Sequence, residues 1–130
     1  MKKIFAIFLS MLTLVTFSSC EKPENVPASY EQINAEQAKT LMDSKDDYVI
    51  IDARTQSEYD AGHIEGAIMI PEYEISDKAE GILKDKDQLI LVYCRSGRRS
   101  KIAAQALVDL GYTNVKEFGG IIDWPYDIVK

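Results

Sequence analysis

Short apolar runs rich in β-branched residues alternate along this chain with segments whose apolar residues recur at helical spacing. The runs YVIID (48–52), AIMIP (67–71) and LILVY (89–93) have the length and composition of strands buried in a parallel sheet. Between them, apolar residues fall at the three- and four-residue intervals of one helical face. This alternation predicts an α/β fold with a central parallel sheet of about five strands and helices on both faces.

Local patterns set the expected bounds of the other elements. Two further strands are expected at residues 30–33 and 115–118, and GGIIDW (119–124) should turn into a short helical segment. Four helices are expected from their capping residues, which are Asn34, Thr55 in the capping box TQSE, Ser76 or Asp77, and the start of SKIAAQALVDL at Ser100. They should end near residues 44, 62, 83 and 111, the second and fourth of them at glycines.

The first twenty residues differ from the rest of the chain. Lys2 and Lys3 precede an apolar run over residues 4–17, which is too short to span a bilayer comfortably. The run leads into FSSC (17–20), which resembles a bacterial lipobox and implies cleavage before Cys20 and lipid attachment to its sulfur. We therefore expect a lipoprotein-type signal peptide at residues 1–19. Phe17 stands where such motifs usually carry Leu, so conventional cleavage is one alternative and a buried amino-terminal helix is another.

The rest of the chain divides into a tether and one domain. Residues 20–29 are polar and carry two prolines, whereas residues 30–130 have the length of a single domain. The chain has a net charge of −6, and loss of Lys2 and Lys3 leaves 13 basic against 21 acidic residues. This balance argues against nucleic acid as a partner. The expected location is the bacterial cell envelope, either lipid-anchored or periplasmic.

One thiol in this acidic chain is surrounded by positive charge. Cys94 follows the most apolar strand, and CRSGRRS (94–100), with its three arginines, leads into a helix. Ligands of open α/β sheets bind at the carboxyl ends of strands, and the unpaired amides of a helix start attract anions. Gly97 permits a tight curl of the loop. The pattern predicts a lowered pKa for the Cys94 thiol and attack of its thiolate on an anionic substrate.

A structural alternative for this segment is a buried cysteine followed by an arginine-rich helix start exposed to solvent. Arginines are unfavourable at a helix amino terminus, because the helix dipole is positive there. If Cys20 carries lipid, Cys94 is also left without a disulfide partner in an oxidising compartment. Both points favour a functional thiol.

Three segments together resemble the rhodanese-like domain family. CRSGRR (94–99) resembles its six-residue active-site loop, IDARTQSEYDAGHIEGAIMIP (51–71) its upstream signature, and GGIIDW (119–124) its closing signature. The resemblance covers residues 31–130. It implies a sulfurtransferase in which Cys94 carries sulfane sulfur as a persulfide, from a thiosulfate-like anionic donor to cyanide or a thiol. The residues that it implies for donor binding are Arg95, Ser96, Gly97, Arg98, Arg99 and Ser100.

Two other functions fit parts of this pattern. One is a non-catalytic domain that binds a persulfide or an anion, or that has a regulatory role. The other is a phosphatase or arsenate reductase, whose loops on related folds read Cys-x5-Arg. Here the sixth residue after Cys94 is Ser100, and Arg99 arrives one position early. The shorter loop makes a tighter cradle, which suits a bound sulfur better than a phosphoryl group.

The remaining polar candidates are expected to be structural. His63, the single histidine, belongs to a turn that the resemblance places away from the sulfur. Asp52 and Arg54 are expected to form a buried ion pair, the alternative being that Arg54 contacts the substrate. Trp124 should be a packing residue of the closing segment, the alternative being a platform for the substrate. One histidine and scattered acids build no metal site, so we expect no metal and no cofactor, and we expect a monomer.

Overall fold

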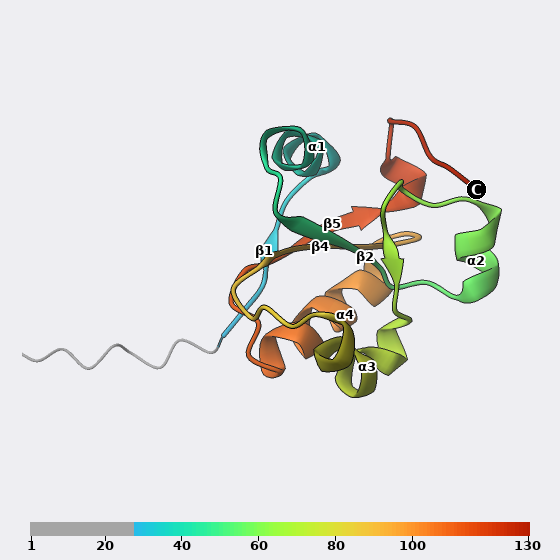
Figure 1. Ribbon diagram of the computed structural model, residues 1–130. Helices are drawn as coiled ribbons and strands as arrows, with labels where there is room; N and C mark the ends of the chain where they lie inside the picture. Colours follow the sequence, from blue (N-terminus) through green and yellow to red (C-terminus); the bar gives the residue numbers. More distant parts are fainter. Residues whose placement is uncertain (1–27) are drawn as a thin grey trace, which may run out of the picture.

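The computed structural model describes residues 28–130, so the predicted signal peptide, Cys20 and most of the predicted tether lie outside the described residues. A five-stranded parallel sheet forms the centre of the domain (Figure 1). Its strands, in spatial order, are β1 (Glu31–Gln32), β5 (Val115–Gly120), β4 (Leu89–Cys94), β2 (Tyr48–Asp52) and β3 (Ile68–Met69). The predicted sheet is therefore confirmed.

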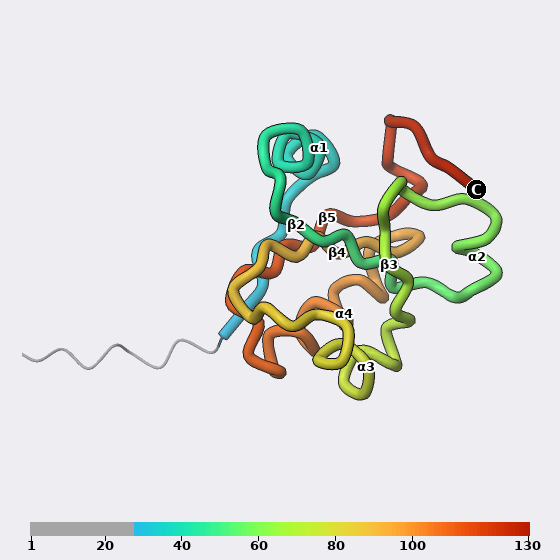
Figure 2. Tube along the Cα trace, in the orientation of Figure 1, coloured from blue at the N-terminus to red at the C-terminus, as the bar shows by residue number. Residues whose placement is uncertain are grey.

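Helices cover both faces of this sheet, as predicted (Figures 1 and 2). Helix α1 (Ala35–Ser44) lies on one face, whereas α3 (Ile75–Ile82) and α4 (Arg98–Asp109) lie together on the other. The short α2 (Gln56–Ala61) lies beside the sheet. Two single-turn 3-10 helices complete the chain, η1 (Glu72–Glu74) and η2 (Ile121–Asp123).

Strand β4 divides the apolar core into two layers. Side chains of a strand alternate between faces, so Ile90, Val92 and Cys94 join the core under α3 and α4. Leu89, Leu91 and Tyr93 join the core under α1. All six residues are buried, as expected for the central strand of a doubly covered sheet. Cys94 is the last of them, and it lies at the carboxyl end of the sheet facing α4.

Two helices begin earlier than the sequence predicts. Helix α4 begins at Arg98 and not at Ser100, because Gly97 takes the left-handed backbone conformation (φ 100°) and places the next residues directly in the helix. Helix α3 begins at Ile75, because η1 leads straight into it and no side-chain cap at Ser76 or Asp77 is used. The predicted caps at Asn34 and Thr55 are confirmed, each as a complete capping box.

The described helices are all short, the longest having 12 residues. Within residues 28–130, none has both the length and the apolar character that crossing a membrane would require.

Candidate active site

The thiol of Cys94 lies where the central strand meets helix α4. The residue is 1% exposed, and its Sγ accepts a hydrogen bond of 3.0 Å from the Gly97 amide. The Ser100 hydroxyl oxygen lies 3.4 Å from the same sulfur. The first contact comes from the three-residue loop between β4 and α4, Arg95 to Gly97, and the second comes from the first turn of α4. The sulfur therefore lies between this loop and the first turn of the helix.

Hydrogen bonds outweigh burial at this sulfur. Burial raises the pKa of the Cys94 thiol, because a charged sulfur loses its hydration. The Ser100 hydroxyl and the backbone amides of Ser100, Gly97 and Ser96 oppose this effect, so the pKa lies below its ordinary value. Successive amides around one point are also a binding site for a small anion. The contacts in the structure thus agree with the predicted lowering of the Cys94 pKa.

The six predicted donor-binding residues fall into two groups. Gly97 and Ser100 are buried and contact the sulfur. Four others stand around them, namely Arg95, Ser96 and Arg98, which are exposed, and Arg99, which is half-buried. The Arg99 guanidinium binds the Glu58 carboxylate through two hydrogen bonds of 2.7 and 2.8 Å. Among residues 28–130 no carboxylate lies within 4.0 Å of the side-chain nitrogens of Arg95 or Arg98.

The end of β5 packs against the loop that follows Cys94. The register between β4 and β5 shifts beyond Val92, so that Cys94 pairs with Gly120. A Cβ built on Gly120 would lie 2.0 Å from the Arg95 carbonyl oxygen and 2.6 Å from the Cα of Ser96. Only glycine allows the loop backbone to approach this closely. The closing segment GGIIDW therefore supports the active-site loop by direct backbone contact.

A buried carboxylate that sequence reasoning missed lies next to this site. Glu117 of β5 is 3% exposed, and its Oε1 accepts hydrogen bonds of 2.6 Å from the Ser100 hydroxyl and 2.7 Å from the Gly119 amide. One signal for it was present in the sequence. Residues at alternate positions of a strand share a face, and Glu117 shares its face with Val115, a core residue.

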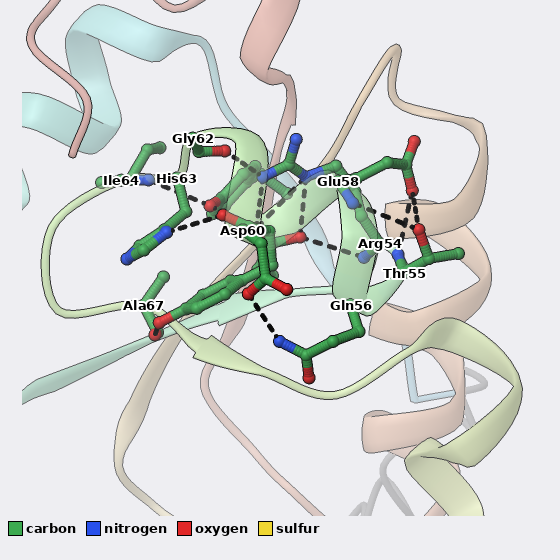
Figure 3. A network of polar contacts seen from close by, with 12 residues as sticks. Arg54, Thr55, Gln56, Glu58, Asp60, Gly62, His63, Ile64 and Ala67 are labelled. Atoms are coloured by element: carbon green, nitrogen blue, oxygen red, sulfur yellow. Dashed lines mark hydrogen bonds and ion pairs between the residues drawn. The ribbon is translucent and has the colours of Figure 1, made fainter. Parts of the chain in front are cut away.

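The other polar candidates have structural partners. The Arg54 guanidinium is 5% exposed and binds the Asp52 carboxylate at 2.7 Å and the Gly62 carbonyl at 2.7 Å (Figure 3). His63 Nδ1 lies 2.9 Å from the Tyr59 carbonyl oxygen (Figure 3), and the two rings stack. These contacts favour the expected ion pair at Asp52 and a structural His63.

Trp124, the aromatic candidate, belongs to the core beneath α1. Trp124 is 9% exposed and packs between the rings of Phe118 and Tyr126. A cleft of about 490 Å³ runs past Trp124 and Tyr48, and it contains no residue of the 94–100 loop. The contacts that lower the pKa of a nucleophile surround the Cys94 thiol and not this cleft, so the thiol is the candidate reactive group. Within residues 28–130, no group of three His, Cys, Asp or Glu side chains is arranged to hold a metal ion.

Comparison with known proteins agrees with this geometry. Residues 34–125 match the rhodanese-like domain family. The chain is 38% identical over 80 residues to thiosulfate sulfurtransferase PspE of Escherichia coli (strain K12), covering 62% of this chain and 77% of that protein. It is 34% identical over 117 residues to thiosulfate sulfurtransferase 18 of Arabidopsis thaliana, covering 81% and 82%. A solved structure described as rhodanese with anions from E. coli has a TM-score of 0.60 and 36% identity, over 64% of this chain and 98% of that one. The chain therefore belongs to the rhodanese-like domain family.

Proposed function

We propose that this protein is a sulfurtransferase that moves sulfane sulfur from a thiosulfate-like donor to a thiol or cyanide through a persulfide on Cys94. The observation that carries the proposal is the setting of the Cys94 sulfur. It accepts the Gly97 amide at 3.0 Å in the first turn of α4, and its pKa is lowered there. A thiolate beside an anion cradle is suited to attack a small anionic donor.

The donor step exchanges one sulfur–sulfur bond for another. The Cys94 thiolate attacks the outer sulfur of thiosulfate, and the bond from that sulfur to the sulfite group breaks. Sulfite leaves with the electron pair of the broken bond, and Cys94 becomes a persulfide whose outer sulfur carries one negative charge. Amides of the loop and of the first turn of α4 stabilise the charge that develops during this transfer.

The acceptor step returns the enzyme to its starting state. Cyanide or a thiolate attacks the outer sulfur of the persulfide and forms a new bond to it. The bond between that sulfur and Cys94 breaks, and its electron pair returns to Cys94 as the thiolate. Cys94 is 1% exposed, so water is largely excluded from its sulfur. This exclusion of water strengthens the electrostatic contribution of the surrounding amides.

Two relatives that are named thiosulfate sulfurtransferases support this choice of donor class. The residue at the sixth position after Cys94 supports it against phosphoryl or arsenate chemistry. That residue is Ser100, whose hydroxyl is bonded to the buried Glu117 at 2.6 Å. No guanidinium occupies this position, where Cys-x5-Arg enzymes have one.

The proposal is tested by steady-state assay of the purified protein. We expect turnover of thiosulfate with cyanide, loss of that turnover in Cys94→Ser, and little hydrolysis of an aryl phosphate. Unfolding temperatures of the two proteins serve as the control for folding. A protein that binds thiosulfate but never releases sulfite would be a non-catalytic binding domain, and efficient phosphatase turnover would contradict the assigned chemistry.

We also propose that the domain works in the bacterial cell envelope, as a monomer held at a membrane by lipid on Cys20 or released into the periplasm. The support is the leader with Lys2 and Lys3, the apolar run at 4–17 and the motif FSSC. Its partners are then small molecules, namely an anionic sulfur donor and a thiol or cyanide acceptor.

A further inference from the structure

The Ser100 hydroxyl stands between two groups that can both be negatively charged. Its oxygen is 3.4 Å from Cys94 Sγ and 2.6 Å from Glu117 Oε1. Carbonyl oxygens of Gly97 and Gly119 lie at 3.1 and 3.4 Å from it. A hydroxyl has one hydrogen, so it can donate to only one of these acceptors at a time.

The distances indicate which acceptor holds that hydrogen at rest. A separation of 2.6 Å between two oxygens is typical of a hydroxyl that donates to a carboxylate. The second donor to Glu117 is the Gly119 amide, and within residues 28–130 no Lys, Arg or His nitrogen lies within 4.0 Å of this carboxylate. Among the described residues, the Ser100 hydroxyl and the Gly119 amide are the two hydrogen-bond donors to this carboxylate. When Ser100 donates to Glu117, its oxygen can act toward Cys94 only as an acceptor. The Cys94 thiol then donates to Ser100, and this contact stabilises the neutral sulfur.

Ionisation of Cys94 reverses this arrangement. A thiolate has no hydrogen to donate, so it gains a donor beyond the backbone amides only if the Ser100 hydroxyl turns toward it. The hydrogen bond from this hydroxyl lowers the pKa of Cys94. Glu117 then loses its short hydrogen bond while it is 3% exposed, which is costly for a buried charge. The lowering of the Cys94 pKa by Ser100 and the stabilisation of Glu117 by Ser100 thus exclude each other.

From this competition we propose that Glu117 is a positioning residue that opposes the Cys94 thiolate through the Ser100 hydroxyl. The inference rests on the proposed function in one respect, namely that Cys94 is the sulfur carrier. In a persulfide the negative charge has moved to the outer sulfur, and the inner sulfur no longer requires the Ser100 hydrogen. That hydrogen can return to Glu117. The arrangement favours the persulfide relative to the thiolate, so it drives sulfur capture from the donor.

Other charges around the sulfur are arranged differently. Arg99, at the start of α4, is paired with Glu58 of α2, and Arg54 is paired with Asp52 of β2. Arg95 of the loop and Arg98 at the start of α4 are exposed to solvent. On β5, Lys116 points to the opposite face of the sheet and binds Glu31 of β1. Glu117 is consequently the described carboxylate that is linked to the sulfur through a single hydroxyl.

The test is a pH titration of the Cys94 thiolate, followed by its ultraviolet absorbance and by its rate of alkylation. Glu117→Gln keeps the side-chain volume, removes the charge, and offers an amide that can donate to the Ser100 oxygen. We expect its midpoint to fall by about one pH unit, which is a tenfold rise in thiolate at a pH below the midpoint. Ser100→Ala should raise the midpoint, because the thiolate loses a donor.

The double variant isolates the hydroxyl. In a Ser100→Ala background, Glu117→Gln should move the midpoint much less than it does in the wild type. An unchanged or raised midpoint in Glu117→Gln would overturn the inference. Equal shifts of the midpoint by Glu117→Gln in the wild-type and Ser100→Ala backgrounds would also overturn it. They would show that the Glu117 charge acts on Cys94 through space and not by competing for the Ser100 hydrogen.

Two further measurements keep the inference testable if a variant fails to fold. In the wild type, infrared difference spectra across the Cys94 titration should show a shifted carboxylate band that is missing in Cys94→Ser; a silent carboxylate region would contradict the inference. Ser100→Thr retains the hydroxyl and should retain the wild-type midpoint. None of these measurements requires sulfur transfer. A shifted titration without sulfane transfer would leave the inference standing and refute the proposed function. Sulfane transfer without the expected shift in the titration would refute the inference and leave the proposed function standing.

Discussion

The Arg99 guanidinium donates to both oxygens of the Glu58 carboxylate, with Nη1 2.7 Å from Oε2 and Nη2 2.8 Å from Oε1. Two parallel hydrogen bonds of this kind fix a guanidinium more firmly than a single contact does. They join the first turn of α4 to α2, across 41 positions of sequence. The pair neutralises one of the three loop arginines. Donor capture should therefore depend mainly on Arg95 and Arg98.

Replacement of Arg95 or Arg98 by Ala should raise the apparent KM for thiosulfate. Thiosulfate is a dianion approaching a chain with net charge −6, so local positive charge has to attract it. Loss of a hydrogen bond to a charged group costs about 1.5–3 kcal/mol, which is a roughly tenfold to hundredfold weakening for a direct contact. Stopped-flow measurement of the donor and acceptor half-reactions gives the two effects separately.

Lys101→Ala is the matched control, because Lys101 is an exposed cation of the same helix and is further from the sulfur along the chain. It should leave donor capture nearly unchanged. Increasing salt should weaken capture in the wild type and have less effect in the two arginine variants. If only acceptor attack slowed, these arginines would serve the acceptor and not the donor.

The Glu58–Arg99 pair should make stability depend on acid pH. Hydrogen bonding from Arg99, together with hydrogen bonds from the amide and hydroxyl of Thr55, lowers the pKa of Glu58 from 4.5 to about 2, against a smaller raising by burial. A lowered carboxyl pKa stabilises the fold above about pH 4.5, and this contribution is lost as the pH falls toward 2. Urea unfolding of the wild type and Glu58→Gln should show a stability difference at pH 7 that shrinks below pH 4.5.

Glu65→Gln is the control for this experiment. Glu65 is exposed and has no ion-pair partner within 4.0 Å among residues 28–130. The substitution should change the free energy of unfolding little at pH 7. A difference between wild type and Glu58→Gln that persisted unchanged to pH 2 would mean that the ionised pair does not stabilise the fold.

Gly120→Ala should damage both the loop and the fold. The new Cβ would meet the Arg95 carbonyl oxygen at 2.0 Å, a backbone atom that cannot swing aside as a flexible side chain would. We expect a loss of about 1–3 kcal/mol in unfolding free energy and a clear fall in sulfur-transfer rate. Gly81→Ala is the control, since nothing lies within 4 Å of its Cβ position in α3, and it should stabilise by about 0.5–1 kcal/mol. Equal effects at the two glycines would contradict the close approach at Gly120.

Cys20→Ser should release the protein from the membrane fraction of an expressing bacterium. The reason is that lipid attachment requires the cysteine sulfur, whereas an ordinary signal peptide does not. Fractionation and intact mass of the full-length product give the result. Membrane partitioning that is the same in both proteins would show that Cys20 carries no anchor.

Local patterns of the sequence were sufficient for the sheet, for the caps at Asn34 and Thr55, and for the position of Cys94 at the end of a buried strand before a helix. Each of these depends on residues that are close together along the chain: alternating apolar runs, Asn34 and Thr55 before their helices, and Cys94 followed by Gly97. The predicted starts of α4 and α3 lie later in the sequence than the observed starts at Arg98 and Ile75. The reason is that a left-handed Gly97 and the turn η1 take the place of side-chain caps there.

Contacts between distant segments could not be predicted in this way. Glu58 was identified only as part of a capping box, and its second partner, Arg99 in the first turn of α4, became apparent only in the folded structure. The sequence analysis did not single out Glu117, because its position beside Ser100 depends on the register of β5 against β4. The support of Arg95 by Gly120 likewise depends on that register.

The central claim is that Cys94 takes up sulfur from an anionic donor, and the intact mass of the protein before and after thiosulfate tests it most directly. The wild type should gain the mass of one sulfur atom, should release one equivalent of sulfite, and should lose the added mass on treatment with cyanide. Cys94→Ser should show none of these changes. A wild type without added mass, or an equal gain in Cys94→Ser, would contradict the persulfide mechanism at Cys94.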